Sequence, residues 1–204
     1  MKQSRKNEVS PYELFGHEKI LRTRDIERCG IPRTRLRQMC EDQILRKIGR
    51  GLYTLYDQNY DTFSSYAQAT KIVPKGVICL LSALRFHALT TQAPNKVWIA
   101  IDNRARTPVV NQSPVKIIKY GNLVYTNGIE THTISGIEVS VYSVAKTICD
   151  CFKYKNKIGI DVALEALREG LKQKSFTSND IWKYAEICNV SKIIMPYMEA
   201  MRIS

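Results

Sequence analysis

The stretch that decides the fold is Ile31-Pro32-Arg33-Thr34-Arg35-Leu36-Arg37-Gln38-Met39-Cys40, followed by Leu45-Arg46-Lys47-Ile48-Gly49-Arg50-Gly51-Leu52-Tyr53. In its first part, Leu36, Met39 and Cys40 recur at the spacing that places them on one face of a helix. A rotation of about 100° per residue puts Thr34 and Gln38 on the opposite face, with Arg35 and Arg37 on the two flanks. The spacing therefore predicts a helix with one buried side and one side that presents a hydroxyl, an amide and guanidinium groups.

The residues before this helix predict its partner in a helix-turn-helix. We expect a short helix over residues 23–28, with Thr23 as the N-cap and Ile26 in the core. Gly30 permits a sharp turn between the two helices. Pro32 suits the start of the second helix, because the first helical position needs no backbone donor.

The residues after the helix predict a β-hairpin wing. Gly49 and Gly51 permit the positive φ angles of a tight hairpin tip, and Arg50 lies between them. From Arg22 to Arg50 there are nine basic and four acidic residues, and eight of the nine are arginine, which favours contact with phosphate and guanine. Hydroxyl and amide groups can read base edges in a major groove. We expect double-stranded DNA to be contacted by Arg22, Arg24, Arg33, Thr34, Arg35, Arg37, Gln38, Lys47 and Arg50. The alternative is a small helical pair with a solvated basic face.

Composition and charge agree with a partner that is a polyanion. The 204 residues carry a formal net charge of +12, and residues 1–50 hold 13 basic and 7 acidic residues. This excess favours nucleic acid or an acidic protein as partner. No stretch approaches the roughly 20 apolar residues of a membrane span, and the N-terminus has no signal-peptide pattern. The six cysteines have no zinc-ligand spacing, so we expect reduced thiols in a cytoplasmic protein, with no metal and no cofactor.

The rest of the chain predicts an α+β fold. A first helix is expected over residues 11–21, and the polar joint 57–61 divides the chain into a winged helix-turn-helix domain, 1–60, and a second domain, 61–204. The second domain should hold a small mostly antiparallel sheet and a helical C-terminal tail. Its expected strands are 96–102, 115–120, 129–134 and 137–142, with Ser135-Gly136 as a hairpin turn, and its expected helices are 62–73, 82–89, 143–154, 161–173, 178–188 and 191–202. Serines are the expected N-caps of three helices: Ser82, Ser143 and Ser178.

The second domain contains no convincing catalytic pattern. There is no serine triad, nucleophile elbow or glycine-rich phosphate loop. A metal-dependent nuclease could use Asp102 with Glu130 or Glu138, but the lysine that often accompanies such carboxylates is missing. His87 follows Phe86 in an apolar helix and is better explained as a core or capping residue. We therefore expect no enzymatic activity.

A second group of basic residues has two readings. It consists of Arg85, Arg104, Arg106, Lys146, Lys153, Lys155 and Lys157. Solvated side chains on polar faces are the simpler reading. The other is a second basic surface that touches the DNA backbone or an acidic protein.

Taken in order, these motifs resemble the AbiE-type antitoxins of abortive-infection, type IV toxin–antitoxin systems. The resemblance is carried by Leu21-Arg22-Thr23-Arg24-Asp25, Cys29-Gly30-Ile31 and the stretch from Leu45 to Tyr53, then by residues 79–87, 97–101, 136–139 and 142–152. It covers about residues 18–172 and leaves the final helices, 176–204, unmatched. Pro32 stands where the family often has a serine cap.

The resemblance implies a function that composition and spacing do not. The N-terminal domain would bind inverted repeats in its own promoter, and the C-terminal domain would neutralise a cognate nucleotidyltransferase-like toxin, without need of a stable complex. The chain would then be a DNA-binding antitoxin and transcriptional autorepressor. The alternatives are a metal-dependent nuclease that the winged helix directs to DNA, and a non-catalytic adaptor that binds protein.

Overall fold

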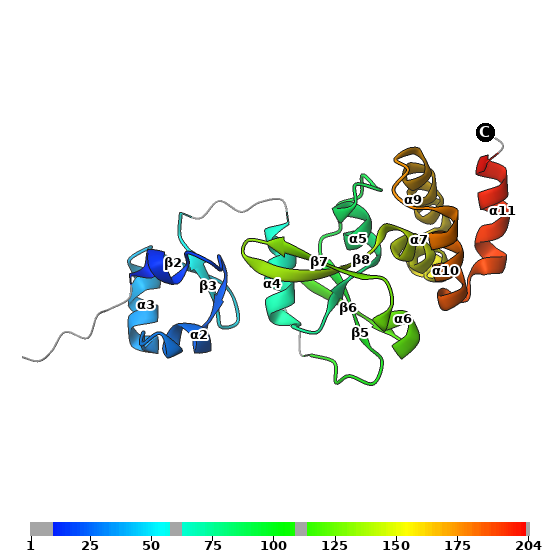
Figure 1. Cartoon of the computed structure of the whole chain (residues 1–204). Helices are drawn as coiled ribbons and strands as arrows, with labels where there is room; N and C mark the ends of the chain where they lie inside the picture. Colours follow the sequence, from blue (N-terminus) through cyan, green and yellow to red (C-terminus); the bar gives the residue numbers. More distant parts are fainter. Residues whose placement is uncertain (1–9, 58–62, 109–113, 203–204) are drawn as a thin grey trace, which may run out of the picture. The chain divides into compact units, whose positions relative to one another are not determined.

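The computed structural model describes residues 10–57, 63–108 and 114–202 (Figure 1). Its contacts group the chain into two compact units. The N-terminal unit comprises Met1–Ile72 with Thr133–Glu138, and the C-terminal unit comprises Val73–His132 with Val139–Ser204. The domain boundary expected between residues 60 and 61 lies outside the described residues, as does most of the polar joint.

The N-terminal unit begins with short elements around a three-stranded sheet. They are α1 (Pro11–Leu14), β1 (Leu21–Arg22), α2 (Thr23–Arg28), α3 (Arg33–Glu41), β2 (Leu45–Gly49), β3 (Leu52–Leu55) and α4 (Ser64–Ile72). The strand order is β1-β3-β2, and both pairings are antiparallel. The helix expected over residues 11–21 is wrong beyond Leu14, because Leu21 and Arg22 extend to pair with Tyr53 and Leu52.

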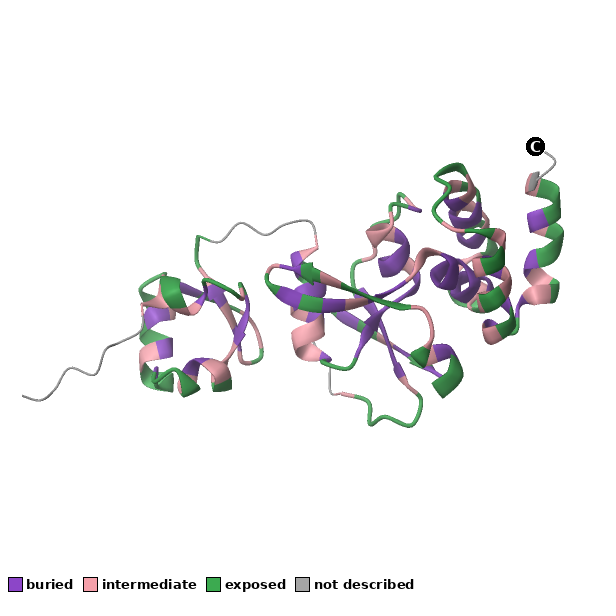
Figure 2. Ribbon diagram, viewed as in Figure 1, coloured by how far each residue is buried: buried purple, intermediate pink, exposed green. Residues whose placement is uncertain are grey.

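The core of this unit forms where the apolar residues of the two helices meet the sheet. Ile26 of α2 and Leu36 and Met39 of α3 are at most 2% exposed, and they pack with Phe15, Leu21, Ile31 and Leu45. Removal of this apolar surface from water is the main force that holds such small elements together. The buried stripes are visible in Figure 2.

Two of the three glycines expected at turns have positive φ angles, and the third does not. Gly30, between α2 and α3, has φ +89°, and Gly51, at the hairpin tip, has φ +67°. Gly49 instead lies in β2 beside a register shift and does not have a positive φ. Thr23 is the first residue of α2 rather than its N-cap, which is Arg22. The backbone N–H of Thr23 donates to the carbonyl of Gly51 over 2.9 Å, which ties α2 to the hairpin tip.

The C-terminal unit is built on a five-stranded sheet in the order β6-β5-β4-β8-β7. The strands are β4 (Val77–Ile78), β5 (Val97–Asp102), β6 (Val115–Tyr120), β7 (Ile129–Ile134) and β8 (Ile137–Tyr142), and the tip of the β7–β8 hairpin belongs to the N-terminal unit. β4 pairs with β5 antiparallel, whereas β5 with β6 and β4 with β8 pair parallel. The sheet therefore contains both parallel and antiparallel strand pairs.

Helices make up the rest of this unit. They are α5 (Leu80–Phe86), α6 (Asn122–Thr126), α7 (Val144–Lys153), α8 (Lys155–Ile158), α9 (Ile160–Lys172), α10 (Ser178–Cys188) and α11 (Ser191–Arg202). α7 is the central one, contacted by α5, α8, α9, α10 and α11 (Figure 1). The predicted α+β fold with a small sheet and a helical C-terminal region is confirmed.

Two of the three expected serine caps are wrong. α5 begins at Leu80, so Ser82 lies inside it, and its hydroxyl accepts a hydrogen bond from the backbone N–H of Trp98 over 2.9 Å. Ser143 is the N-cap of α7 by position, but its side chain makes no capping hydrogen bond. The N-cap of α10 is Thr177, whose hydroxyl accepts from the N–H of Asp180.

Candidate nucleic-acid interface

The outer face of α3 presents the side chains that the sequence placed there. Thr34 and Gln38 are exposed on the side opposite Leu36 and Met39. Arg33 and Arg37 are exposed on the same helix, and Arg35 is half-buried beside them. A polar, basic helix face of this kind can enter a major groove, where the amide and hydroxyl groups reach base edges.

Some of the arginines expected to contact DNA already form ion pairs within the chain. Three of them pair with carboxylates: Arg24 with Asp25 at 3.4 Å, Arg33 with Glu27 at 2.7 Å and Arg37 with Glu41 at 3.3 Å. Exposed pairs of this kind contribute little to stability, so a phosphate can replace the carboxylates at little cost. The i,i+4 spacing of Arg37 and Glu41 could have indicated one pair. The pair of Arg33 and Glu27 crosses the turn between helices, and no local sequence signal identifies it.

Arg35 and Gln38 act together in the free protein. The Arg35 guanidinium donates to the side-chain oxygen Oε1 of Gln38 over 3.1 Å. This bond occupies the amide oxygen of Gln38, so the NH₂ group is the end of the amide that can donate to a ligand. The pair therefore offers hydrogen-bond donors to a groove, which suit guanine O6 and purine N7 acceptors.

The hairpin supplies two exposed cations of the expected set. Lys47 lies on β2, and Arg50 is at the tip between β2 and β3. A charge at a hairpin tip can meet phosphate at the side of the groove that the helix enters. The hairpin and α3 both pack on the core of the N-terminal unit, so these cations belong to the same unit as the helix face.

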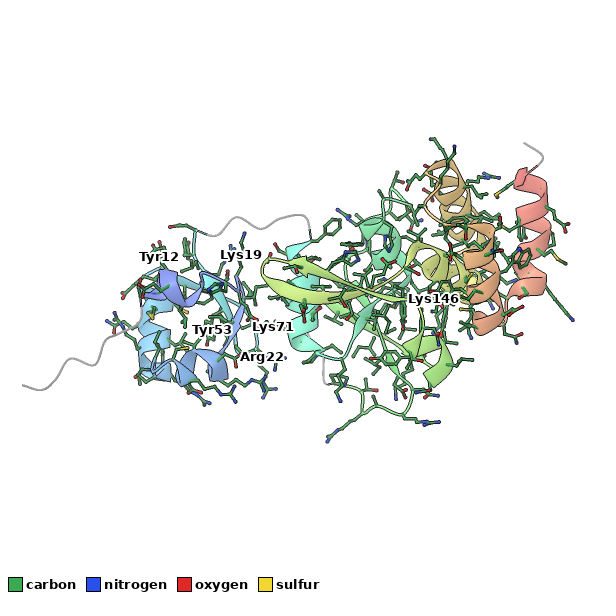
Figure 3. All side chains as sticks on the ribbon, viewed as in Figure 1. Tyr12, Lys19, Arg22, Tyr53, Lys71 and Lys146 are labelled. Carbon is green, nitrogen blue, oxygen red and sulfur yellow. The ribbon has the colours of Figure 1, made fainter. Side chains whose placement is uncertain are left out.

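Arg22 is a correction to the expected set. Its side chain is half-buried and donates to the backbone carbonyl of Lys71, in the last turn of α4 (Figure 3). Burial lowers the pKa of its guanidinium. Arg22 is thus used inside the N-terminal unit. Its contact with Lys71 joins residues 49 positions apart, and no local sequence signal predicts it.

Lys146 is a second correction, since it is fully buried rather than part of a basic surface. Its Nζ lies 2.6 Å from Oδ2 of Asp150, one helical turn away on α7, and 4.1 Å from the centre of the Tyr142 ring. Both members of the pair have no exposed side-chain surface. Burial raises the pKa of Asp150, and the neighbouring ammonium opposes that shift. α7 is covered by other helices, so its whole circumference is core.

The other members of the expected second basic surface are at least partly exposed. Arg104, Arg106, Lys153 and Lys157 are exposed, and Arg85 and Lys155 are half-buried. Lys153, Lys155 and Lys157 lie around the junction of α7 and α8, and the hydroxyl of Tyr154 at this junction donates to the carbonyl of Lys119 on β6 over 3.3 Å. The junction and β6 therefore lie side by side in the C-terminal unit.

The carboxylates considered for a nuclease are not gathered. The Asp102 carboxylate accepts hydrogen bonds from the backbone of Arg104 and the amide of Asn122, at 2.7 and 3.2 Å. Glu130 lies on β7, which β4 and β8 separate from β5, a distance of about 14 Å at the usual strand spacing. Glu138 lies on β8, separated from β5 by β4. Within residues 10–57, 63–108 and 114–202, no three His, Cys, Asp or Glu side chains are arranged to hold a metal ion.

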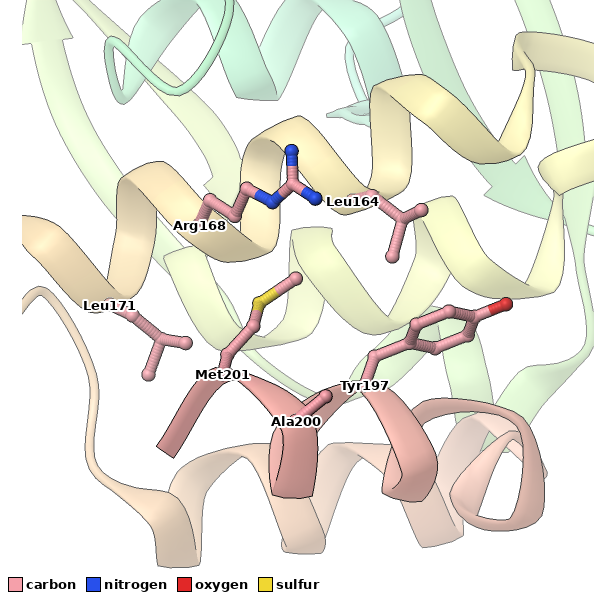
Figure 4. Close-up of a pocket in the computed structure, with 6 residues that line it drawn as sticks. All are labelled: Leu164, Arg168, Leu171, Tyr197, Ala200 and Met201. Carbon is pink, nitrogen blue, oxygen red and sulfur yellow. The ribbon is translucent and has the colours of Figure 1, made fainter. Parts of the chain in front are cut away.

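A cavity in the C-terminal unit lies between α9 and α11 (Figure 4). Its volume is about 470 Å³, and it is lined by Leu164, Arg168, Leu171, Tyr197, Ala200 and Met201. Only Arg168 and Tyr197 bring ionisable groups to it. Such a lining can bind apolar surface, but it does not combine a nucleophile with a base.

The helix pair, the turn at Gly30 and the basic hairpin are consistent with a winged helix-turn-helix, a class of fold that reads duplex DNA. Residues 11–56 match the family described as "Transcriptional regulator, AbiEi antitoxin". The resemblance to AbiE-type antitoxins is thus confirmed over these residues, which are less than a quarter of the 204-residue chain. The wider resemblance, to residue 172, stays a prediction. A comparison with curated proteins gave no match. No helix in the part of the chain that the structure describes is long and apolar enough for a membrane crossing.

Proposed function

We propose that this chain is a DNA-binding antitoxin that represses its own operon in a type IV, abortive-infection toxin–antitoxin system. It acts in the cytoplasm, has no catalytic activity and counteracts a nucleotidyltransferase-like toxin. The observation that carries the DNA-binding part is the exposed face of α3, with Thr34 and Gln38 between arginines, on a segment that matches a transcriptional-regulator family.

In this proposal α3 enters the major groove, and its centre reads bases. Thr34 and Gln38 point away from the core, and the Arg35–Gln38 hydrogen bond presents donors outward. A helix of nine residues is about 14 Å long, enough for its exposed face to span a few base pairs. Inverted repeats in the promoter would then be read by two copies of the chain, one on each half-site.

The basic side chains around this helix face bind the phosphate backbone of the DNA. Arg24, Arg33 and Arg37 exchange their carboxylate partners for phosphates, and Lys47 and Arg50 contact phosphates from the wing. These contacts give affinity without sequence preference and make binding salt-dependent. The second basic surface, without Lys146, is available to the DNA backbone or to an acidic protein.

The experiment for DNA binding is a gel shift with the intact protein. One duplex carries the DNA immediately upstream of the chain's own gene, and the other is an unrelated duplex of equal length. We expect tighter binding to the upstream duplex, as for a specific regulator. Equal binding to both duplexes would contradict autorepression, and no binding to either would contradict DNA binding altogether.

The experiment for the antitoxin part is co-expression. The proposal requires a neighbouring gene for a nucleotidyltransferase-like protein that is toxic alone and tolerated when this chain is present. Toxicity that is unchanged by this chain would remove the antitoxin role and leave the repressor role standing. Incubation of the protein with plasmid and Mg²⁺ or Mn²⁺ tests the nuclease alternative, and cleavage that Asp102→Ala abolishes would overturn the non-catalytic reading.

A further inference from the structure

The wing hairpin contains a β-bulge near its tip. Lys47 pairs with Tyr53 and Gly49 with Leu52, so the register shifts between them and Ile48 is the extra residue. A bulge residue is left out of the regular ladder. Because an unpaired backbone carbonyl is unfavourable when partly buried, the carbonyl of Ile48 needs a partner from elsewhere.

Helix α4 supplies that partner. The side-chain amide of Gln68 donates from Nε2 to the carbonyl oxygen of Ile48 over 2.6 Å. Gln68 is half-buried at this contact. α4 begins at Ser64, beyond the segment 11–56 that matches the regulator family.

The last turn of α4 makes a second connection, to the other edge of the same sheet. The carbonyl of Lys71 is among the helix-terminal carbonyls that lack an intrahelical partner, and it accepts a hydrogen bond from Arg22 of β1. The Lys71 ammonium pairs with Glu18 at 2.6 Å and is only 16% exposed. Since the strand order is β1-β3-β2, α4 forms hydrogen bonds with both outer strands of the three-stranded sheet.

We propose that α4 is part of the DNA-binding unit and that Gln68 is a positioning residue for the wing. By donating to the carbonyl of Ile48, Gln68 fixes the conformation of the hairpin at the bulge. Lys47 and Arg50, on either side of the bulge, are thereby held in the positions in which they contact phosphate. A hairpin that is already ordered loses less conformational entropy on binding DNA. The inference rests on the proposed function, because it assumes that the wing touches DNA.

The test uses full-length protein with two substitutions at one position. Gln68→Ala removes the side chain beyond Cβ, and Gln68→Met keeps its length but has no N–H donor. Ser65→Ala, an exposed position on the same helix, is the matched control. We expect both Gln68 variants to bind the upstream and the unrelated duplex about threefold to tenfold more weakly, the loss that follows one hydrogen bond. Ser65→Ala should bind like the wild type.

Two further readouts separate positioning from a general loss of structure. Hydrogen–deuterium exchange of residues 45–55 should be faster in both Gln68 variants, while exchange in α7 stays unchanged. In an Arg50→Ala background, the additional effect of Gln68→Ala on DNA affinity should shrink, since the two residues act through the same hairpin.

The outcomes are distinct. Weaker DNA binding with faster exchange in the hairpin and a reduced effect in the Arg50→Ala background supports the inference. Unchanged DNA affinity, unchanged exchange in the hairpin, or a full additive effect in that background overturns it. If the wild-type protein binds neither duplex, the proposed function fails instead, which is a different result from equal binding by wild type and variants.

Discussion

Arg35 and Gln38, three positions apart on α3, show how two side chains of one helix can work as one group. Sequence spacing places Gln38 outward and Arg35 on the flank, and the hydrogen bond of 3.1 Å between them adds a fixed orientation of the amide. Orientation matters because a side chain that is already held in place loses less freedom on binding a base edge.

Arg35→Ala is the first prediction at this scale. Loss of the guanidinium removes one groove donor and frees the Gln38 amide, so the upstream duplex should bind more weakly by about 1–3 kcal/mol. Gln38→Ala should have a similar effect, and the double variant should lose less than the sum of the two, because the residues share one interaction. Gel-shift titrations of the four proteins measure this, and a fully additive double variant would show that the pair is not a unit.

Lys146 and Asp150 give the second prediction. Lys146→Met leaves the carboxylate of Asp150 buried without its partner, so the free energy of unfolding should fall by about 3–5 kcal/mol. The double variant Lys146→Met/Asp150→Leu should recover most of that loss, since no charge is then left in the core. Chemical denaturation measures both. A single variant as stable as the wild type would mean that the carboxyl is already neutral and does not need the ammonium.

At the scale of elements, the β7–β8 turn shows why one glycine is required. Ser135 and Gly136 have φ angles of +53° and +76°, as a two-residue hairpin turn demands. A Cβ added at Gly136 would overlap the carbonyl oxygen of His17, also in the N-terminal unit. The backbone N–H of Lys19 donates to the carbonyl of Ser135 over 3.0 Å at the same place.

Gly136→Ala should therefore destabilise the protein through strain and through a clash. Gly30→Ala is the matched control, because Gly30 also has a positive φ but nothing lies within 4 Å of its added Cβ. We expect each substitution to lose about 1–2 kcal/mol from strain at positive φ, with a further loss for Gly136→Ala alone. Equal denaturation midpoints for the two variants would mean that the segment at His17 moves aside freely.

The elements divide into those that local sequence predicts and those that need distant partners. The turn at Gly30, helix α3 and the β7–β8 hairpin follow from periodicity and turn residues that lie within a few positions of one another. The predicted helix over residues 11–21 includes Leu21 of β1, because β1 is extended only through its pairing with β3. The parallel pairing of β4 with β8 joins residues 78 and 141, and no local pattern specifies it.

The residues of the candidate site also divide into those that local sequence predicts and those that depend on distant partners. The exposure of Thr34 and Gln38 follows from the helical period of Leu36 and Met39, so it could be predicted. The use of Arg22 by α4 and the burial of Lys146 could not, because a count of charges does not say which of them meet a carbonyl or a carboxylate in the folded chain.

At the scale of the whole molecule, the net charge of +12 predicts DNA affinity that falls steeply with salt. Lys47→Ala should weaken binding to the upstream and unrelated duplexes equally and lower the salt slope by about one, since a single phosphate contact is lost. Lys192→Ala, an exposed lysine on α11 outside the proposed interface, should leave the slope unchanged. Titrations at several salt concentrations measure the slopes. Identical slopes for Lys47→Ala and the wild type would mean that Lys47 of the wing does not contact a DNA phosphate.

The most direct test of the account compares how strongly the wild type and the variant Thr34→Ala/Gln38→Ala prefer the upstream duplex over an unrelated one. If the outer face of α3 reads bases, the wild type prefers the upstream duplex and the variant loses most of that preference, while affinity for the unrelated duplex changes little. A variant that keeps the full preference of the wild type would contradict the placement of α3 in the groove.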